Sequence, residues 1–139
     1  MSYGPADLYA VEFPKSVDPA QVTATLRDVT TAGIITLLDV AMVRTSPDGS
    51  REVVEFKAFA DEIGLAGVRP AAEGLIGDED LLDLSEEIAP DSTLLVVLLE
   101  NAWARKVAQS VQDSHAVARS VERFSADVVN EVAALAYFD

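Results

Sequence analysis

The residues best suited to chemistry in this chain are one histidine and two carboxylates that interrupt apolar stretches. His115 is the only histidine, and Glu12 and Asp39 each lie inside an apolar run that is expected to form a strand. A carboxylate in such a run either faces solvent or has a partner, because an unpaired buried charge is costly. A carboxylate held in a pocket is also suited to act as a general base. Glu12, Asp39 and His115 are therefore the candidates if the chain has an active site.

Structural pairing of these carboxylates is the preferred interpretation, with Arg44, Arg119 or Arg123 as the expected partner. Nucleophilic catalysis would need His115 beside a serine such as Ser114, with an aspartate behind it. No Gly-x-Ser-x-Gly segment marks such a triad. We therefore expect no catalytic residue and no enzymatic activity.

Metal and cofactor sites are also disfavoured by the residues present. The chain has no cysteine, which excludes disulfides, thiolate zinc sites, iron–sulfur clusters and cysteine nucleophiles. We interpret His115 as a solvated loop residue. One segment carries eight acids and no base: Glu73, Asp78, Glu79, Asp80, Asp83, Glu86, Glu87 and Asp91. It lacks the glycine turn and the distal bidentate glutamate of a calcium loop. The segment is therefore expected to be a solvated face. No metal ion or cofactor is expected.

The charge of the chain narrows the classes of partner. Its 139 residues carry 24 acids and 10 bases, a net charge of −14. A field of this sign repels phosphate backbones and anionic lipid headgroups, so we expect neither nucleic acid nor a membrane surface as a partner. A basic protein, a cation or a second copy of the chain remain open. The simplest interpretation is that the charge keeps an apolar protein soluble.

The length and composition are typical of one globular domain over residues 1–139. Half of the residues are apolar, which is enough to form a sizeable core. The N-terminus has no basic segment followed by an apolar one, and no apolar run approaches the roughly 20 residues that a membrane helix needs. These features, with the absence of cysteine, favour a cytoplasmic location.

Apolar periodicity and capping residues predict an alternation of strands and helices. The glycine-rich segment Ile63–Gly77 is expected to be a loop because it holds four of the seven glycines and Pro70. The strand at Thr93–Leu99 has no charged residue and is expected to be covered on both faces. The elements expected in order are strand Leu8–Phe13, helix Asp18–Gly33, strand Ile34–Arg44, edge strand Arg51–Lys57, a helix from Asp78 to before Pro90, strand Thr93–Leu99, helix Asn101–Asp113, strand Ala116–Phe124 and a last helix capped by Ser125.

This order predicts an α+β fold of the ferredoxin-like type. Two βαβ halves, at about residues 7–60 and 92–139, would form the split βαβ sheet, joined by the glycine-rich loop and the acidic helix over residues 61–91. The hairpin strand adds an edge, and the last helix is an extension of the fold. Right-handed crossovers would place the first strand beside Thr93–Leu99. If these two strands are antiparallel, Glu12 and Glu100 lie at opposite ends of the sheet.

Three segments of the chain resemble those of a known family. They are the opening Gly4–Pro14, the stretch Leu37–Val43 before Pro47-Asp48-Gly49, and Leu98–Ala104. The chain resembles a family of small actinobacterial proteins of unknown function, which is similar to bacterial stress-associated proteins that carry a glycine-zipper membrane hairpin between two half-domains. The resemblance implies fold positions and no catalytic residue. Here the short Ile63–Gly77 loop stands in place of the hairpin, so a soluble member is expected.

The apolar excess of the strands predicts an interaction surface. A ferredoxin-like sheet has helices on one face, so the other face must be covered by the last helix, by the glycine-rich loop or by another chain. We expect a self-associating or protein-binding module, a homo-oligomer, with interface candidates Leu38, Val40, Met42, Leu94, Val96, Leu98, Val128 and Val132. Opposite charges in Glu73–Asp91 and in the later half (Arg105, Lys106, Arg119, Arg123) would permit head-to-tail contacts. The alternative is a small-molecule-binding protein or enzyme of the dimeric α+β barrel type.

Overall fold

A computed structural model describes residues 3–117, 119 and 125–138 of the chain. These residues form two compact units, Met1–Val107 and Ala108–Asp139, which are described separately. The prediction of a single domain over residues 1–139 stays a prediction.

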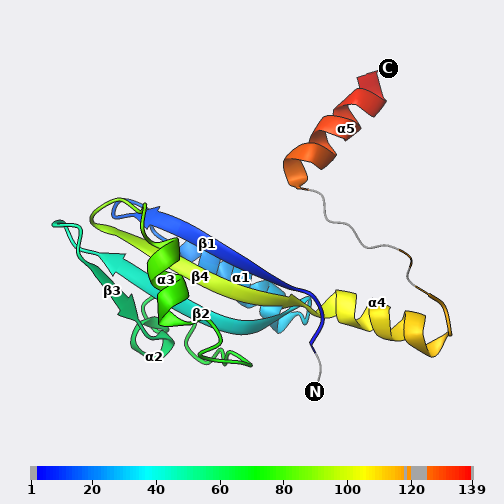
Figure 1. The fold of residues 1–139 in the computed structure, drawn as a ribbon, viewed down its shortest axis with the longest axis horizontal. Coiled ribbons are helices and arrows are strands. Elements are labelled where there is room, and N and C mark those ends of the chain that lie inside the picture. Colours follow the sequence, from blue (N-terminus) through cyan, green and yellow to red (C-terminus); the bar gives the residue numbers. More distant parts are fainter. Residues whose placement is uncertain (1–2, 118, 120–124, 139) are drawn as a thin grey trace. The chain divides into compact units, whose positions relative to one another are not determined.

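The first unit is built on a four-stranded antiparallel sheet with the strand order β1-β4-β2-β3 (Figure 1). The strands are β1 (Ala6–Pro14), β2 (Ile35–Thr45), β3 (Arg51–Val54) and β4 (Ser92–Asn101). Since β1 and β2 are each antiparallel to β4, they run parallel to one another with β4 between them. The sheet and its helices make this a mixed α+β fold, as the sequence predicts.

Both faces of the sheet are covered by segments of the first unit. Helix α1 (Ala20–Thr31) lies on one face and helix α3 (Asp78–Leu84) on the other (Figure 1). The short helix α2 (Phe56–Phe59) packs on the α1 side. One apolar cluster therefore includes Leu26, Leu95 and Val97, and a second cluster includes Leu81, Leu94 and Val96. The alternation of β4 side chains between two covered faces explains why this strand has no charge from Thr93 to Leu99.

The sequence signals at the ends of α1 act as predicted. The Asp18 carboxylate accepts the Ala20 N–H at 3.0 Å at the start of the helix. Past its end, Gly33 has φ +76°, the left-handed conformation that glycine adopts without a Cβ penalty. These signals place β2 directly after the helix.

The predicted edge strand Arg51–Lys57 is wrong in its second half. Strand β3 ends at Val54, and α2 begins at Phe56. The rings of Phe56 and Phe59 meet edge to face with centroids 5.6 Å apart, and both are buried in the core. Helical spacing brings both rings to the same side of the backbone, whereas a strand would separate them. Packing therefore outweighs the alternation that predicts a strand.

The glycine-rich segment packs against both faces of the sheet, with Ile63 and Leu65 in the apolar cluster on the α1 side and Ile76 in the cluster on the opposite side. The N–H groups of Ala71 and Ala72 donate to the carbonyls of Leu37 and Leu38 at 2.9 and 2.8 Å. These bonds lie beside a register shift between Leu37 and Asp39 in the pairing of β2 with β4. The bulge leaves strand carbonyls for the loop, so the segment is fixed to the sheet by its backbone.

The described residues contain only the first of the two predicted βαβ halves. The first strand and Thr93–Leu99 are antiparallel neighbours, and Glu12 pairs with Leu94 while Glu100 pairs with Ala6. The two glutamates therefore lie at opposite ends of the sheet, as expected. The strand predicted at Ala116–Phe124 lies largely outside the described residues, so the second βαβ half is not established.

Two further helices, α4 (Ala102–Asp113) and α5 (Ala126–Phe138), follow the sheet. Helix α5 belongs to the second unit and begins where the sequence predicts, with the Val128 N–H donating to Ser125 Oγ at 3.3 Å. Helix α3 is shorter than predicted and ends at Leu84 instead of continuing toward Pro90. Among the described residues, no helix is long and apolar enough to cross a membrane.

Candidate interaction surface

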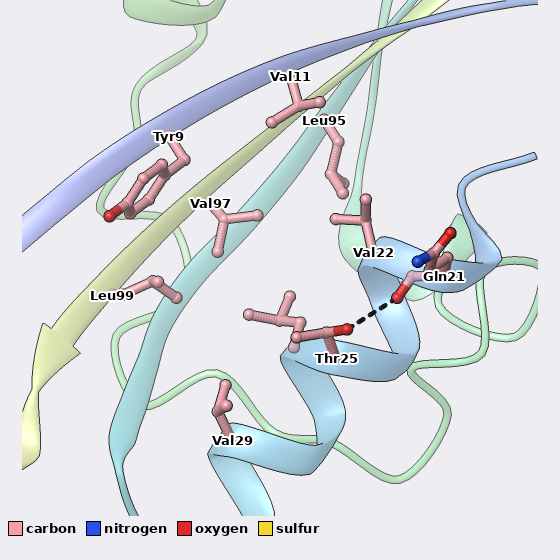
Figure 2. Close-up of a pocket in the computed structure, with 10 residues that line it drawn as sticks. Tyr9, Val11, Gln21, Val22, Thr25, Val29, Leu95, Val97 and Leu99 are labelled. Carbon is pink, nitrogen blue, oxygen red and sulfur yellow. Dashed lines mark hydrogen bonds between the residues drawn. The ribbon is translucent and has the colours of Figure 1, made fainter. Parts of the chain in front are cut away.

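An apolar groove lies between α1 and the β1–β4 half of the sheet. It has a volume of about 400 Å³. Figure 2 shows Val97 and Leu99 of β4 facing Val22, Thr25 and Val29 of α1 across this groove. The groove forms because α1 buries Leu26, which is 9% exposed, but leaves Val22 43% exposed. We call this feature the α1 groove; its lining is Tyr9, Val11, Gln21, Val22, Thr25, Leu26, Val29, Leu95, Val97 and Leu99.

The α1 groove contains no charged side chain. Its helix contributes two polar residues, and the Thr25 hydroxyl is already used because it donates to the Gln21 carbonyl at 3.1 Å (Figure 2). The Tyr9 ring lies at the β1 side of the groove. A surface of this kind binds apolar groups by burial, and its lining contains no carboxylate and no imidazole.

Strand β1 borders this groove and is an edge strand of the described sheet. It pairs with β4 along its whole length, from Ala6 to Pro14. Leu8 and Tyr9 are each 49% exposed, although they point to opposite faces of the sheet. An edge strand leaves half of its backbone donors and acceptors without a partner in the sheet. Among the described residues, the outer backbone groups of β1 therefore have no strand partner, and apolar side chains are exposed beside them.

Asp39 has a structural role that differs from the predicted arginine pairing. Its side chain is 3% exposed. Oδ1 accepts the Val40 N–H at 2.9 Å, and Oδ2 accepts the Ile76 N–H at 2.8 Å. Arg44 pairs instead with Glu62 on the surface, and Arg123 lies outside the described residues. The carboxylate is thus bound to backbone donors of the strand and the glycine-rich segment.

Glu12 does not join Asp39 in a site. Glu12 is exposed on β1 opposite Leu94, whereas Asp39 lies opposite Leu98 on β2. Four residues along β4 separate these two positions, roughly 13 Å at the rise of a strand. His115 belongs to the second unit, is exposed, and follows α4 with φ +62°. The structure thus does not bring the two carboxylates together.

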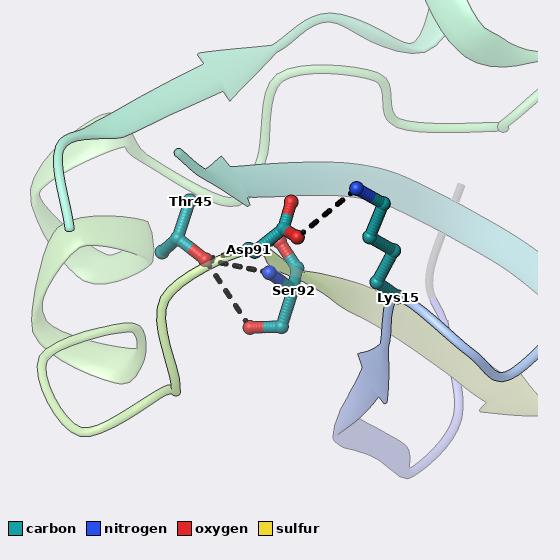
Figure 3. A network of polar contacts seen from close by, with 4 residues as sticks. All are labelled: Lys15, Thr45, Asp91 and Ser92. Carbon is teal, nitrogen blue, oxygen red and sulfur yellow. Dashed lines mark hydrogen bonds and ion pairs between the residues drawn. The ribbon is translucent and has the colours of Figure 1, made fainter. Parts of the chain in front are cut away.

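A polar network closes the end of the sheet where β4 begins (Figure 3). The Ser92 N–H donates to Thr45 Oγ1 at 2.9 Å, and the Thr45 hydroxyl donates to the Ala89 carbonyl at 2.7 Å. Beside them, Lys15 Nζ lies 3.3 Å from Asp91 Oδ2. Lys15, Thr45, Asp91 and Ser92 line part of a pocket of about 380 Å³. Because its hydroxyls and charges bind one another, the network fixes the turn before β4.

Glu100 is a buried charge that the sequence analysis missed. It lies at the end of β4 and is fully buried. Oε2 accepts the Gly4 N–H, and Arg105 Nη2 lies 3.5 Å from Oε1. Oε1 has no hydrogen bond, so the ion pair with Arg105 is its compensation. The signal in the sequence is an acid directly after seven uncharged strand residues, followed five positions later by an arginine.

The predicted interface residues fall into three groups. Leu38, Val40, Met42, Leu94 and Val96 are buried within the first unit and would contact a partner only if that unit opened. Leu98 is half-buried on β4. Val128 and Val132 are exposed on α5 in the second unit. The exposed apolar residues of the first unit instead include Leu8, Tyr9 and Val22, which the sequence analysis did not select.

Metal ligands do not gather in the described parts of the chain. Within residues 3–117, 119 and 125–138, no group of three or more histidine, aspartate or glutamate side chains is arranged to hold a metal ion. The acids of α3 lie on a short helix whose first turn is Asp78, Glu79 and Asp80. They face solvent near the positive end of the helix dipole, which stabilises the helix.

Comparison with known proteins gives a family and no activity. The model of a family of unknown function, DUF6325, matches residues 2–138. No curated protein and no solved structure matches the chain.

Proposed function

We propose that this chain, which belongs to the DUF6325 family of unknown function, is a self-associating module without catalytic activity. The observation that supports the proposal is the position of the uncharged α1 groove beside an edge strand with apolar side chains exposed on both faces. A second copy placed against this strand and groove would bury apolar surface and at the same time provide partners for the backbone groups of the strand. We call the combination of β1 and the α1 groove the β1 margin.

A second copy fits the charge of the β1 margin better than nucleic acid or lipid does. The α1 groove has no charge, and the two charged residues of β1 are both acids, Asp7 and Glu12. The whole chain carries −14. Polyanionic partners would be repelled, whereas a neutral apolar surface of the same chain would not. Repulsion between the net charges of two copies opposes association and is reduced by salt.

The roles of the carboxylates support a function other than catalysis. Both oxygens of Asp39 accept backbone N–H groups, and the buried Glu100 is paired with the partly exposed Arg105. A general base needs a lone pair directed at a substrate, and neither carboxylate lines the α1 groove. The role of both carboxylates is therefore to stabilise the fold.

Several finer expectations belong to this proposal. We propose that the sheet is ferredoxin-like, supported by the parallel relation of β1 and β2 on either side of β4, and that a second copy takes the position beside β1 which the last strand holds in that fold. A cytoplasmic location, an actinobacterial origin and a kinship with stress-associated proteins are likewise proposals. They rest on the composition and on the sequence resemblance described above.

Light scattering with surface variants tests the proposed function. The unmodified chain should reach a mass of twice the 14.8 kDa of one chain as concentration rises. Tyr9→Lys should keep the mass near that of one chain, because a charge at the β1 margin would have to be buried. Ile34→Lys is the matched control, because Ile34 is also 49% exposed but lies away from β1. Equal masses for the two variants, or a monomeric parent chain, would contradict the proposal.

A second candidate function is the binding of an apolar small molecule. The volume of the α1 groove, about 400 Å³, falls within the range of small-molecule pockets. This candidate predicts a monomer that binds an apolar fluorescent probe, with weaker binding after Leu99→Ser. Because Leu99 lines the groove, the loss of apolar area should weaken probe binding without changing the mass.

A further inference from the structure

The backbone of β1 shows which of its residues are free to bond a new strand. The Asn101 N–H donates to the Pro5 carbonyl at 3.0 Å, which makes these two residues a hydrogen-bonded pair. Along an antiparallel ladder, hydrogen-bonded and non-bonded pairs alternate. In the register Ala6↔Glu100, the odd-numbered residues of β1 therefore bond β4. The even-numbered residues direct their N–H and C=O groups to the outer edge, where no strand of the described residues pairs with them; these are Ala6, Leu8, Ala10 and Glu12.

Prolines limit this free edge at both ends. Pro14 is even-numbered, so its missing N–H belongs to the outward set and breaks no bond to β4. Pro5 lies just before the strand. The stretch able to donate and accept on its outer side thus runs from Ala6 to Glu12, with Tyr9 at its centre.

We propose that β1 pairs antiparallel with β1 of a second copy, about a two-fold axis at Tyr9. This inference rests on the proposed self-association and adds its surface and register. A two-fold pairing must match even-numbered residues with even-numbered residues, because only these have outward groups. The axis can then lie at Leu8, Tyr9 or Ala10.

Hydrogen bonding selects Tyr9 among these three centres. With the axis at Tyr9, Ala6 faces Glu12 of the second copy and Leu8 faces Ala10, so every outward N–H and C=O has a partner. With the axis at Ala10, Ala6 would face Pro14, which has no N–H. With the axis at Leu8, Glu12 would face Gly4, whose N–H already donates to Glu100 Oε2.

Side chains agree with the same register. At Tyr9 the two copies meet in a non-hydrogen-bonded pair, where opposite side chains are closest, so two half-exposed tyrosine rings cover one another. Asp7 lies opposite Val11 of the second copy, and Glu12 lies opposite Ala6. No carboxylate faces another carboxylate across the pair. Since Tyr9 and Val11 also line the α1 groove, the grooves of the two copies adjoin on one face.

A cysteine scan tests the register directly, because the natural chain has no cysteine. The variants Leu8→Cys, Tyr9→Cys and Ala10→Cys are oxidised and run on a non-reducing gel. Only Tyr9→Cys places two thiols directly opposite one another, within the distance that a disulfide spans. We expect at least a tenfold excess of disulfide-linked dimer for Tyr9→Cys over the other two. The strongest cross-link at position 8 or 10 would overturn the register.

A proline variant completes the test. Ala10→Pro removes an outward N–H and leaves the bonds to β4 in place, so the double variant Tyr9→Cys/Ala10→Pro should lose the cross-link and keep the circular dichroism of the fold. If no variant cross-links while light scattering still gives a dimer, this inference fails and the proposed function stands. If the parent chain is a monomer whose Leu8 and Ala10 amides resist exchange, another segment of the same chain occupies the edge, and both proposals fail.

Discussion

The carboxylate of Asp39 in β2 accepts the backbone N–H of Ile76, 37 residues later in the sequence, at 2.8 Å. This bond joins the sheet to the last part of the glycine-rich segment, directly before α3. The same carboxylate accepts the Val40 N–H next to the bulge. Asp39 therefore fixes the end of the glycine-rich segment to the sheet, which explains an acid inside an apolar strand.

Replacing Asp39 should loosen this segment. We expect Asp39→Ala to lower the free energy of unfolding by about 2–3 kcal/mol, because a buried N–H loses its charged acceptor. Urea denaturation measures the change, and faster hydrogen exchange of the Ile76 amide locates it. Asp83→Ala on the exposed side of α3 is the control and should change stability by less than about 0.5 kcal/mol. An equal effect of the two variants would show that the bond contributes nothing.

Glu100 and Arg105 should be energetically coupled. Arg105→Ala should cost about 1–2 kcal/mol of stability, less than the roughly 3–5 kcal/mol of wholly buried pairs, because the arginine side chain is 39% exposed. After Glu100→Gln the same replacement should cost under about 0.5 kcal/mol, since no buried charge remains. A double-mutant cycle by urea denaturation measures the coupling, with Lys106→Ala as the control. Additive effects would mean that the two groups act independently.

Asp48 in the β2–β3 turn gives a pH dependence. Hydrogen bonds from the Ser50 backbone N–H and then from its hydroxyl hold the pKa of Asp48 below its usual value. A depressed folded-state pKa stabilises the fold above the unfolded-state pKa, and this stabilisation is lost as pH falls through the folded-state value. Ser50→Ala removes the hydroxyl donor, so the pKa of Asp48 should rise toward its usual value in an NMR titration. An unchanged titration would show that the hydroxyl has no effect.

Hydrogen exchange should detect pairing of the β1 edge. The outward amides of Leu8, Ala10 and Glu12 should exchange more slowly as protein concentration rises. The amides of Tyr9 and Val11 bond β4 in any state and should stay protected throughout, so they serve as internal controls. Exchange that is independent of concentration at all five amides would be evidence against pairing between copies.

Local signals in the sequence were sufficient for the main elements of the first unit. Asp18 and Gly33 mark the ends of α1, and the uncharged stretch Thr93–Leu99 marks the central strand, because capping chemistry and two-sided burial act through neighbouring residues. The strand β3 was predicted too long because the core contacts of Phe56 and Phe59 come from other parts of the chain. Alternation alone cannot report such contacts.

The candidate site was less accessible to sequence reasoning. The apolar residues chosen as an interface are those that the fold buries first, as Val96 and Met42 show. The exposed residues Tyr9 and Val22 are no more apolar than these buried residues. They are exposed only because of the position of α1 over the sheet. The acceptor role of Asp39 likewise depends on a backbone donor 37 residues away, which no local pattern indicates.

Sedimentation equilibrium of the unmodified chain at low and high salt tests self-association most directly. The account predicts a dimer of twice 14.8 kDa that tightens as salt rises from about 0.05 to about 0.5 M, because screening reduces the repulsion between two copies of charge −14. A mass of 14.8 kDa at every concentration would contradict self-association. A dimer that salt dissociates would contradict the β1 margin as its surface and would favour contacts between oppositely charged patches.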